Sequence, residues 1–107
     1  MNRFDLPPAV VAGMEGNGLG VARPLHAAGI PVIGVGAPEW NPAYLSRAVK
    51  VRRLKSWTKA GFIEGLLALG AELGAETPLL FTKDEAVLWA SESREELSRY
   101  FHFTFPP

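Results

Sequence analysis

The sequence contains no cysteine, which excludes several kinds of chemistry from the start. A chain without cysteine has no disulfide framework, no thiolate nucleophile and no cysteine-ligated zinc or iron–sulfur site. Long apolar runs are also missing. No stretch approaches the length needed to cross a bilayer, and the opening residues MNRFDLPP lack the apolar core of a signal peptide. We therefore expect a cytoplasmic protein with no membrane partner.

An excess of charge of either sign is missing too. Lys plus Arg and Asp plus Glu number 11 each, so the formal net charge is zero. Generic nucleic-acid binding depends on surplus basic residues that neutralise phosphates, so no nucleic-acid partner is expected. What is present is an apolar fraction of 48% in 107 residues. This is enough for the core of one globular domain, which we expect to span residues 1–107.

Short apolar runs alternate with helical patterns along the chain. Residues 8–13 (PAVVAG) and 30–36 (IPVIGVG) are typical of buried strands. Between them, apolar residues recur at helical spacing up to Gly29, although Pro24 should kink or shorten that helix. After these, we expect a helical turn at 43–47, an edge strand at 48–54, a helix from Thr58 to Gly74 and a strand at 77–82. A further helix should follow residue 83 and restart at Ser93, where Ser93 and Glu96 fit a capping box. A short strand at 102–105 should end the domain.

This order predicts an α/β fold. Two strands joined by a helix form a right-handed βαβ unit with parallel strands, and the pattern continues to the end of the chain. The expected architecture is a Rossmann-like, three-layer open parallel sheet of about five strands, with helices on both faces.

A glycine-rich loop follows the first strand, at the edge where open parallel sheets bind ligands. Its glycines let the backbone approach a ligand, and free N–H groups at the following helix start favour a phosphate or carboxylate. Asn17 adds an amide to the same loop. The spacing fits neither G-x-G-x-x-G, since the third position falls on Val21 or Arg23, nor a P-loop. A tight strand-to-helix turn without a ligand therefore remains an alternative.

Two other loops lie at the same expected edge, at 36–41 and at 82–85. The second brings together a hydroxyl (Thr82), a cation (Lys83) and two carboxylates (Asp84 and Glu85). Either carboxylate could hold an ammonium or hydroxyl group of a substrate, while helix capping and dipole compensation explain Asp84 equally well. The sequence shows no Ser-His-Asp pattern and no metal-ligand spacing, so no catalytic residue and no metal ligand is predicted.

Residues 47–59 contain six basic residues and no acidic one. They could form an anion-binding strip, but a solvated edge strand with charged flanks is the interpretation that we favour. Whether Arg47 contacts a ligand or forms a salt bridge stays open at this point. The two histidines, His26 and His102, have no nearby acid or nucleophile pattern and are expected to be structural.

Several segments, in order, resemble a known family. The segment PAVVAGMEGNGLGVARPLHAAGIPVIGVG is similar to the start of ATP-grasp carboxylate–amine ligases of the D-aspartate ligase type. There, a strand, an Asn-Gly-Leu-Gly loop, a helix ending in AGIPV and a second strand open the chain. The resemblance continues through Ser46-Arg47, LLFTKDEAV and REELSRYFHFTFP, and so covers residues 8–106. It implies the N-terminal pre-ATP-grasp domain of an ATP-dependent ligase.

The resemblance also implies roles for particular residues. The loops would face a cleft between domains and hold a small carboxylate or amine substrate, through Asn17, Gly18, Leu19, Gly20, Thr82, Asp84 and Glu85. In the family, ATP and magnesium bind to central and C-terminal domains that follow the fifth strand. Since this sequence stops there, we expect it to bind no cofactor and to be inactive without an ATP-grasp partner. The alternative is a self-contained binding or regulatory module for a nucleotide or small anion.

A missing domain would leave its docking surface uncovered. Apolar residues of that surface should then be exposed or should pair two copies in a homodimer. The candidates are Leu19, Trp40, Tyr44, Trp89 and residues 101–105.

Overall fold

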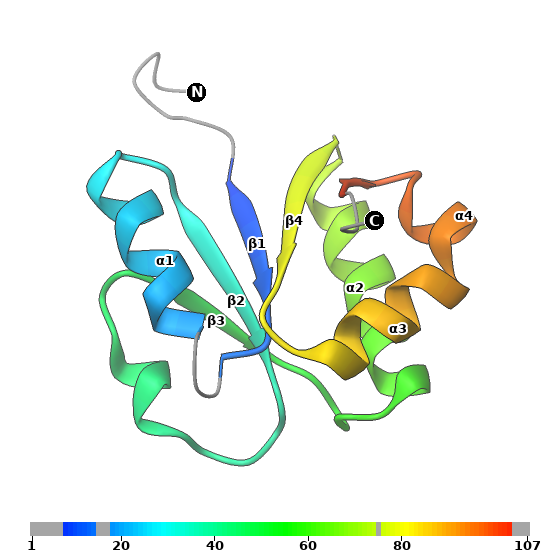
Figure 1. The fold of residues 1–107 in the computed structure, drawn as a ribbon, viewed down its shortest axis with the longest axis horizontal. Helices are drawn as coiled ribbons and strands as arrows, with labels where there is room; N and C mark the ends of the chain where they lie inside the picture. The colour runs from blue at the N-terminus through cyan, green and yellow to red at the C-terminus, as the bar shows by residue number, and fades with distance from the viewer. Residues whose placement is uncertain (1–7, 15–17, 75, 104–107) are drawn as a thin grey trace.

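The computed structural model describes residues 8–14, 18–74 and 76–103. Strands and helices alternate along the chain (Figure 1). The elements are β1 (Ala9–Ala12), α1 (Gly18–Ala27), β2 (Val32–Gly36), the 3₁₀ helix η1 (Pro42–Leu45), β3 (Lys50–Arg53), α2 (Lys59–Leu73), β4 (Thr77–Phe81), α3 (Asp84–Glu92), α4 (Arg94–Leu97) and β5 (Phe101–His102).

The strands form a five-stranded parallel sheet in the order β3-β2-β1-β4-β5. Helix α1 covers one face, and α2, α3 and α4 cover the other (Figure 1). The predicted Rossmann-like parallel sheet with helices on both faces is thus confirmed. The chain moves outward from β1 to β2 and β3 and then returns to place β4 on the other side of β1. The strand order therefore reverses between β1 and β4, where such sheets bind ligands beyond the carboxyl ends of their strands.

Apolar layers fill both sides of the sheet. On the side of α2, α3 and α4, Val10 and Ala12 of β1 pack with Phe62 and Leu66 of α2. On the side of α1, the core includes Val11 of the same strand. All four residues of β1 are buried, as expected for a central parallel strand covered on both faces. This explains why the first strand is a continuous apolar run rather than an alternating one.

Helix α2 begins and ends where its terminal residues predict. The hydroxyl of Thr58 accepts a hydrogen bond from the Gly61 N–H at 3.1 Å. At the other end, Gly74 adopts the left-handed conformation (φ 71°), and its N–H donates to the Gly70 carbonyl at 2.9 Å. Both predicted caps are confirmed.

Helix α1 does not stop at its proline. It continues past Pro24 to Ala27, so the expected shortening does not occur. Proline lacks the N–H that would bond to the Gly20 carbonyl, but Gly20 and Pro24 are both exposed, and water can satisfy that carbonyl. The helix therefore tolerates the loss of one backbone hydrogen bond on its solvent-exposed face.

Other boundaries differ from the predictions in informative ways. A further helix, α4, does begin after Ser93, as predicted. The Ser93 side chain makes no capping hydrogen bond, however, so the predicted capping box is not formed. Strand β5 begins at Phe101, one residue before the predicted segment, and residues 104–105 lie outside the described residues. The helical turn occupies 42–45, because the Asn41 side chain accepts from the Ala43 N–H at 2.8 Å and starts it earlier.

The predicted exposed apolar surface is only partly present. Trp40 is 58% exposed, as expected. Leu19, Tyr44 and Trp89 are only half-buried. Phe101 and Phe103, in contrast, are buried in the core on the side of α2, so for these two residues the expectation was wrong. The pairing of β4 with β5 places them there, and the last strand is an integral part of the sheet.

Candidate functional site

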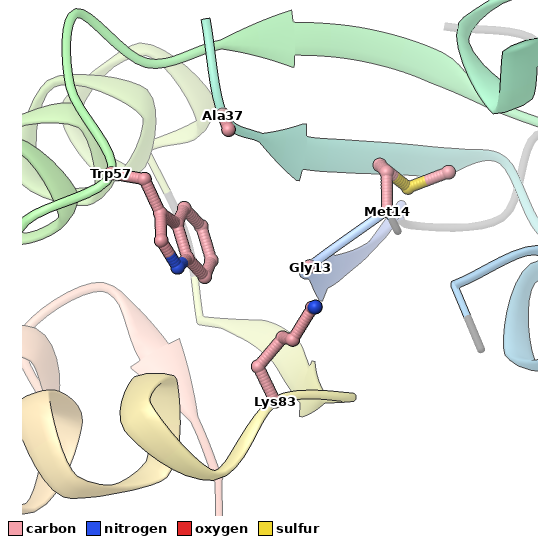
Figure 2. Close-up of a pocket in the computed structure, with 5 residues that line it drawn as sticks. All are labelled: Gly13, Met14, Ala37, Trp57 and Lys83. Atoms are coloured by element: carbon pink, nitrogen blue, oxygen red, sulfur yellow. The ribbon is translucent and has the colours of Figure 1, made fainter. Parts of the chain in front are cut away.

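A small pocket lies at the carboxyl ends of four neighbouring strands, around the reversal of strand order (Figure 2). We call it the switch-point pocket, and its lining residues are Gly13, Met14, Ala37, Trp57 and Lys83. Gly13 and Met14 follow β1, Ala37 follows β2, Trp57 lies between β3 and α2, and Lys83 follows β4. Its free volume is about 20 Å³, which suits one small group rather than a whole nucleotide.

The floor of the pocket is held by hydrogen bonds across the sheet. The Thr82 hydroxyl donates to the Gly13 carbonyl at 2.6 Å, and the Ala12 carbonyl lies 3.2 Å from the same oxygen. The backbone continues the pairing, since the Thr82 N–H donates to the Ala12 carbonyl at 3.1 Å. On the other side, the Gly13 N–H donates to the Val35 carbonyl at 2.8 Å. The end of β1 is therefore fixed from both neighbouring strands.

Gly13 has no room for a side chain. Its φ of 105° is in the region that favours glycine, and an added Cβ would lie 2.5 Å from Thr82 Oγ1 and 2.8 Å from Lys83 Cγ. The aliphatic part of Lys83 thus passes directly over Gly13. Figure 2 shows the Lys83 side chain extending from the segment before α3 toward Gly13. The Lys83 side chain therefore lines the pocket at the end of β1.

Trp57 forms an apolar wall of the pocket. Its indole ring packs edge-on against Phe62, with ring centroids 5.7 Å apart, and against Trp89, at 5.4 Å. The ring is thus held from behind by α2 and α3, which limits the rotamers that it can adopt. Met14 and Ala37, both buried, supply further apolar surface. A pocket with one cation and rigid apolar walls suits a small anionic group that carries a short apolar substituent.

Tyr44 braces the outer side of the site. Its hydroxyl donates to the Ala37 carbonyl at 2.5 Å, which ties η1 to the end of β2. The Arg53 guanidinium lies 5.0 Å from the centre of the Tyr44 ring, a cation–π distance. Tyr44 therefore holds the loop after β2 against the sheet, rather than forming part of an open apolar patch.

The predicted residues at the start of α1 lie beside the pocket. Gly18 is buried, and an added Cβ would lie 2.6 Å from the Gly13 carbonyl oxygen, so the helix begins in direct contact with the end of β1. Leu19 packs into the core on the side of α1, and Gly20 is exposed. Asn17 lies outside the described residues. A role of these residues in substrate binding stays a prediction.

The predicted residues of the loop at 82–85 divide into two roles. Thr82 uses its hydroxyl proton to hold the end of β1, which is a structural task. Asp84 and Glu85 are exposed in the first turn of α3, where their charges compensate the positive end of the helix dipole. Neither lines the switch-point pocket, and their contact with a substrate stays a prediction.

The residues that line the pocket are sequence neighbours of the predicted ones. Lys83 stands between Thr82 and Asp84, and the sequence identified it only as the cation of that loop. Trp57 was missed altogether, although it follows the third strand and so lies at the same edge of the sheet. The rule that identifies loops after strands would have found it if applied to every strand.

Within residues 8–14, 18–74 and 76–103, no three His, Cys, Asp or Glu side chains gather closely enough to hold a metal ion. None of the helices in this part of the chain has the length and apolarity required of a bilayer span. The switch-point pocket itself is too small for ATP.

Comparison with protein families, with curated proteins and with solved structures gives no match to this chain.

Proposed function

We propose that this chain is the substrate-side, pre-ATP-grasp domain of an ATP-dependent carboxylate–amine ligase. In this proposal the switch-point pocket binds the carboxylate of a small substrate, and a separate ATP-grasp domain supplies ATP and magnesium. The observation that carries the proposal is the position of Lys83, whose side chain crosses Gly13 into the pocket where the strand order reverses. The ordered resemblance over residues 8–106 supports the same function.

The size and character of the pocket favour a small ligand group. A free volume of about 20 Å³ accepts a group the size of a water molecule or one carboxylate oxygen, and leaves the rest of the substrate outside. The ligand would therefore lie between this pocket and another surface, which agrees with a domain that completes its site only with a partner. Trp57 and Met14 provide apolar contact for the carbon next to the carboxylate.

Calorimetric titration of the chain with a panel of small polar amino acids, small dicarboxylates and Mg-ATP tests the proposal. We expect weak, saturable binding of carboxylates and no binding of Mg-ATP. Replacing Lys83 with Met removes the charge and keeps most of the aliphatic chain, and should abolish that binding. Lys55→Met is the matched control, because the Lys55 side chain is 88% exposed and its ion pair among the described residues is with Glu64 at 3.5 Å.

Two results would count against the proposal. Equal carboxylate affinity of the Lys83→Met variant and the unchanged protein would exclude the switch-point pocket as the site. Tight binding of ATP, or of another nucleotide, by the isolated chain would instead support the alternative of a self-contained nucleotide-binding module.

A further inference from the structure

A second hollow lies at the opposite edge of the sheet from the switch-point pocket. We call it the amino-edge groove, because it surrounds the first residues of β2 and β3. Its lining includes His26, Val32, Ile33, Arg47, Val49 and Lys50. Its volume is about 560 Å³, within the range of pockets that hold small molecules.

Among the described residues that line the groove, several are basic and none is acidic. Arg47, Lys50 and His26 are all exposed, and no Asp or Glu of the described chain lines the groove. Neither Arg47 nor Lys50 forms an ion pair with any described residue. Among the residues that the structure describes, no acidic side chain competes with a ligand for these two charges.

Other cations of the basic segment at 47–59 behave differently. Three of them pair with acidic residues of α2 or α3: Arg52 with Glu72 at 2.6 Å, Lys55 with Glu64 at 3.5 Å and Lys59 with Glu92 at 3.4 Å. The structure thus divides the segment in two. Arg52, Lys55 and Lys59 pair with glutamates of α2 and α3. Arg47 and Lys50 instead line a groove in which no described residue carries a counter-charge.

Local hydrogen bonds hold the backbone on two sides of the groove. The Ala48 N–H donates to the Ser46 hydroxyl at 3.1 Å, which shapes the turn that carries Arg47. Helix α1 ends nearby in a Schellman motif, in which the Ile30 N–H donates to the Leu25 carbonyl at 3.0 Å and the Gly29 N–H donates to the His26 carbonyl at 2.9 Å. Two of the terminal carbonyls are thereby satisfied, which reduces their repulsion of an anion near His26.

From this geometry we infer that the amino-edge groove binds a small anionic ligand with an apolar body. The anionic group of the ligand, a carboxylate or a phosphate, contacts Arg47 and Lys50. The guanidinium of Arg47 can bind either anion through two parallel hydrogen bonds, and Lys50 adds a second positive charge. The apolar body lies against Val32, Ile33 and Val49. This site is separate from the switch-point pocket and does not depend on the proposed function.

Nuclear magnetic resonance titration of the ¹⁵N-labelled chain tests the inference. The probes are phenyl phosphate, phenylacetate, benzyl alcohol and inorganic phosphate. We expect saturable shifts in the amides of residues 31–33 and 47–50 with the two apolar anions, and much weaker ones with the neutral alcohol or with phosphate alone. A larger response to phenyl phosphate assigns phosphate esters as the ligand class, and a larger response to phenylacetate assigns carboxylates.

Charge-removing variants make the test specific. The double variant Arg47→Gln, Lys50→Gln should weaken binding about tenfold or more, because it removes both charge-assisted contacts. The matched control Lys55→Gln, Arg99→Gln removes the same charge from other exposed positions and should bind as the unchanged protein does. Lys83→Met should also leave binding in the groove unchanged.

Circular dichroism and the melting temperature show whether each variant is folded. The inference is overturned if benzyl alcohol binds as tightly as the anions, if the shifts do not saturate, or if the folded Arg47→Gln, Lys50→Gln variant keeps full affinity.

Discussion

The hydrogen bond from Thr82 to Gly13 should contribute measurably to stability. The bond is 2.6 Å long and partly buried, and a hydrogen bond of this kind contributes about 1 kcal/mol net to the free energy of unfolding. Replacing Thr82 with Val keeps the shape and removes the hydroxyl, leaving the Gly13 carbonyl without this donor. We expect a loss of about 1 kcal/mol, which lowers the melting temperature of a domain of this size by about 4–8 °C.

The assay is urea and thermal unfolding of three proteins: the unchanged chain, Thr82→Val and Thr82→Ser. Serine keeps the hydroxyl and loses a half-buried methyl group, which should cost less than about 0.8 kcal/mol. Valine should therefore be the less stable variant. If Thr82→Val is as stable as the unchanged protein, or more stable than Thr82→Ser, then the hydroxyl does not hold the end of β1 as described.

Three further substitutions test the packing. Leu66→Ala should cost about 2–5 kcal/mol in chemical denaturation, because Leu66 is fully buried, and a loss below about 1 kcal/mol would show that the core is not packed as described. Thr58→Ala should cost about 1 kcal/mol and Thr58→Ser much less, because only the hydroxyl caps α2; equal losses would contradict this. Gly34→Ala should cost about 1–3 kcal/mol, since its Cβ would lie 2.3 Å from Met14 Sδ and 2.6 Å from Val49 Cγ1; an unchanged unfolding midpoint would show that these side chains move aside.

The fold was predictable because its elements depend on local patterns. Continuous apolar runs mark β1 and β2 as buried on both faces, and alternation of valines with basic residues marks β3 as an edge strand, which the observed strand order confirms. The two ends of α2 follow from Thr58 and Gly74, because caps act within one turn. Boundaries that depend on tertiary contacts were less accurate: pairing with β4 decides where β5 begins, and Phe101 is buried as a result.

The position of the switch-point pocket was predictable, but the side chains that line it were not. Parallel strands bring their carboxyl ends to one edge, so the loops after β1 and β4 were identified correctly as neighbours. Which side chain of a loop enters the pocket depends on backbone conformation that the sequence does not reveal. Thr82 turned toward Gly13 and Lys83 crossed over it, while Asp84 began a helix. The place of Trp57 at this edge follows from the same rule, but the orientation of its ring depends on Phe62 and Trp89, which α2 and α3 bring behind it.

The partition of the basic segment was equally hidden from the sequence. Ion pairs between β3 and α2 follow from the packing of the helix on the sheet, so no local pattern separates Arg52, which is paired with Glu72, from Arg47, which has no described acidic partner. The structure confirms the charged edge strand, whereas anion binding by this segment stays a prediction.

The most direct test of the account is to follow the indole N–H resonance of Trp57 while the tightest-binding carboxylate of the panel is added. Trp57 lines the switch-point pocket, whereas Trp40 is 58% exposed on the loop after β2 and serves as an internal reference. We predict a saturable shift of the Trp57 signal, none for Trp40, and loss of the response in Lys83→Met. If the carboxylate binds while the Trp57 signal stays unmoved, or if the Lys83→Met variant responds fully, the switch-point pocket is not the substrate site.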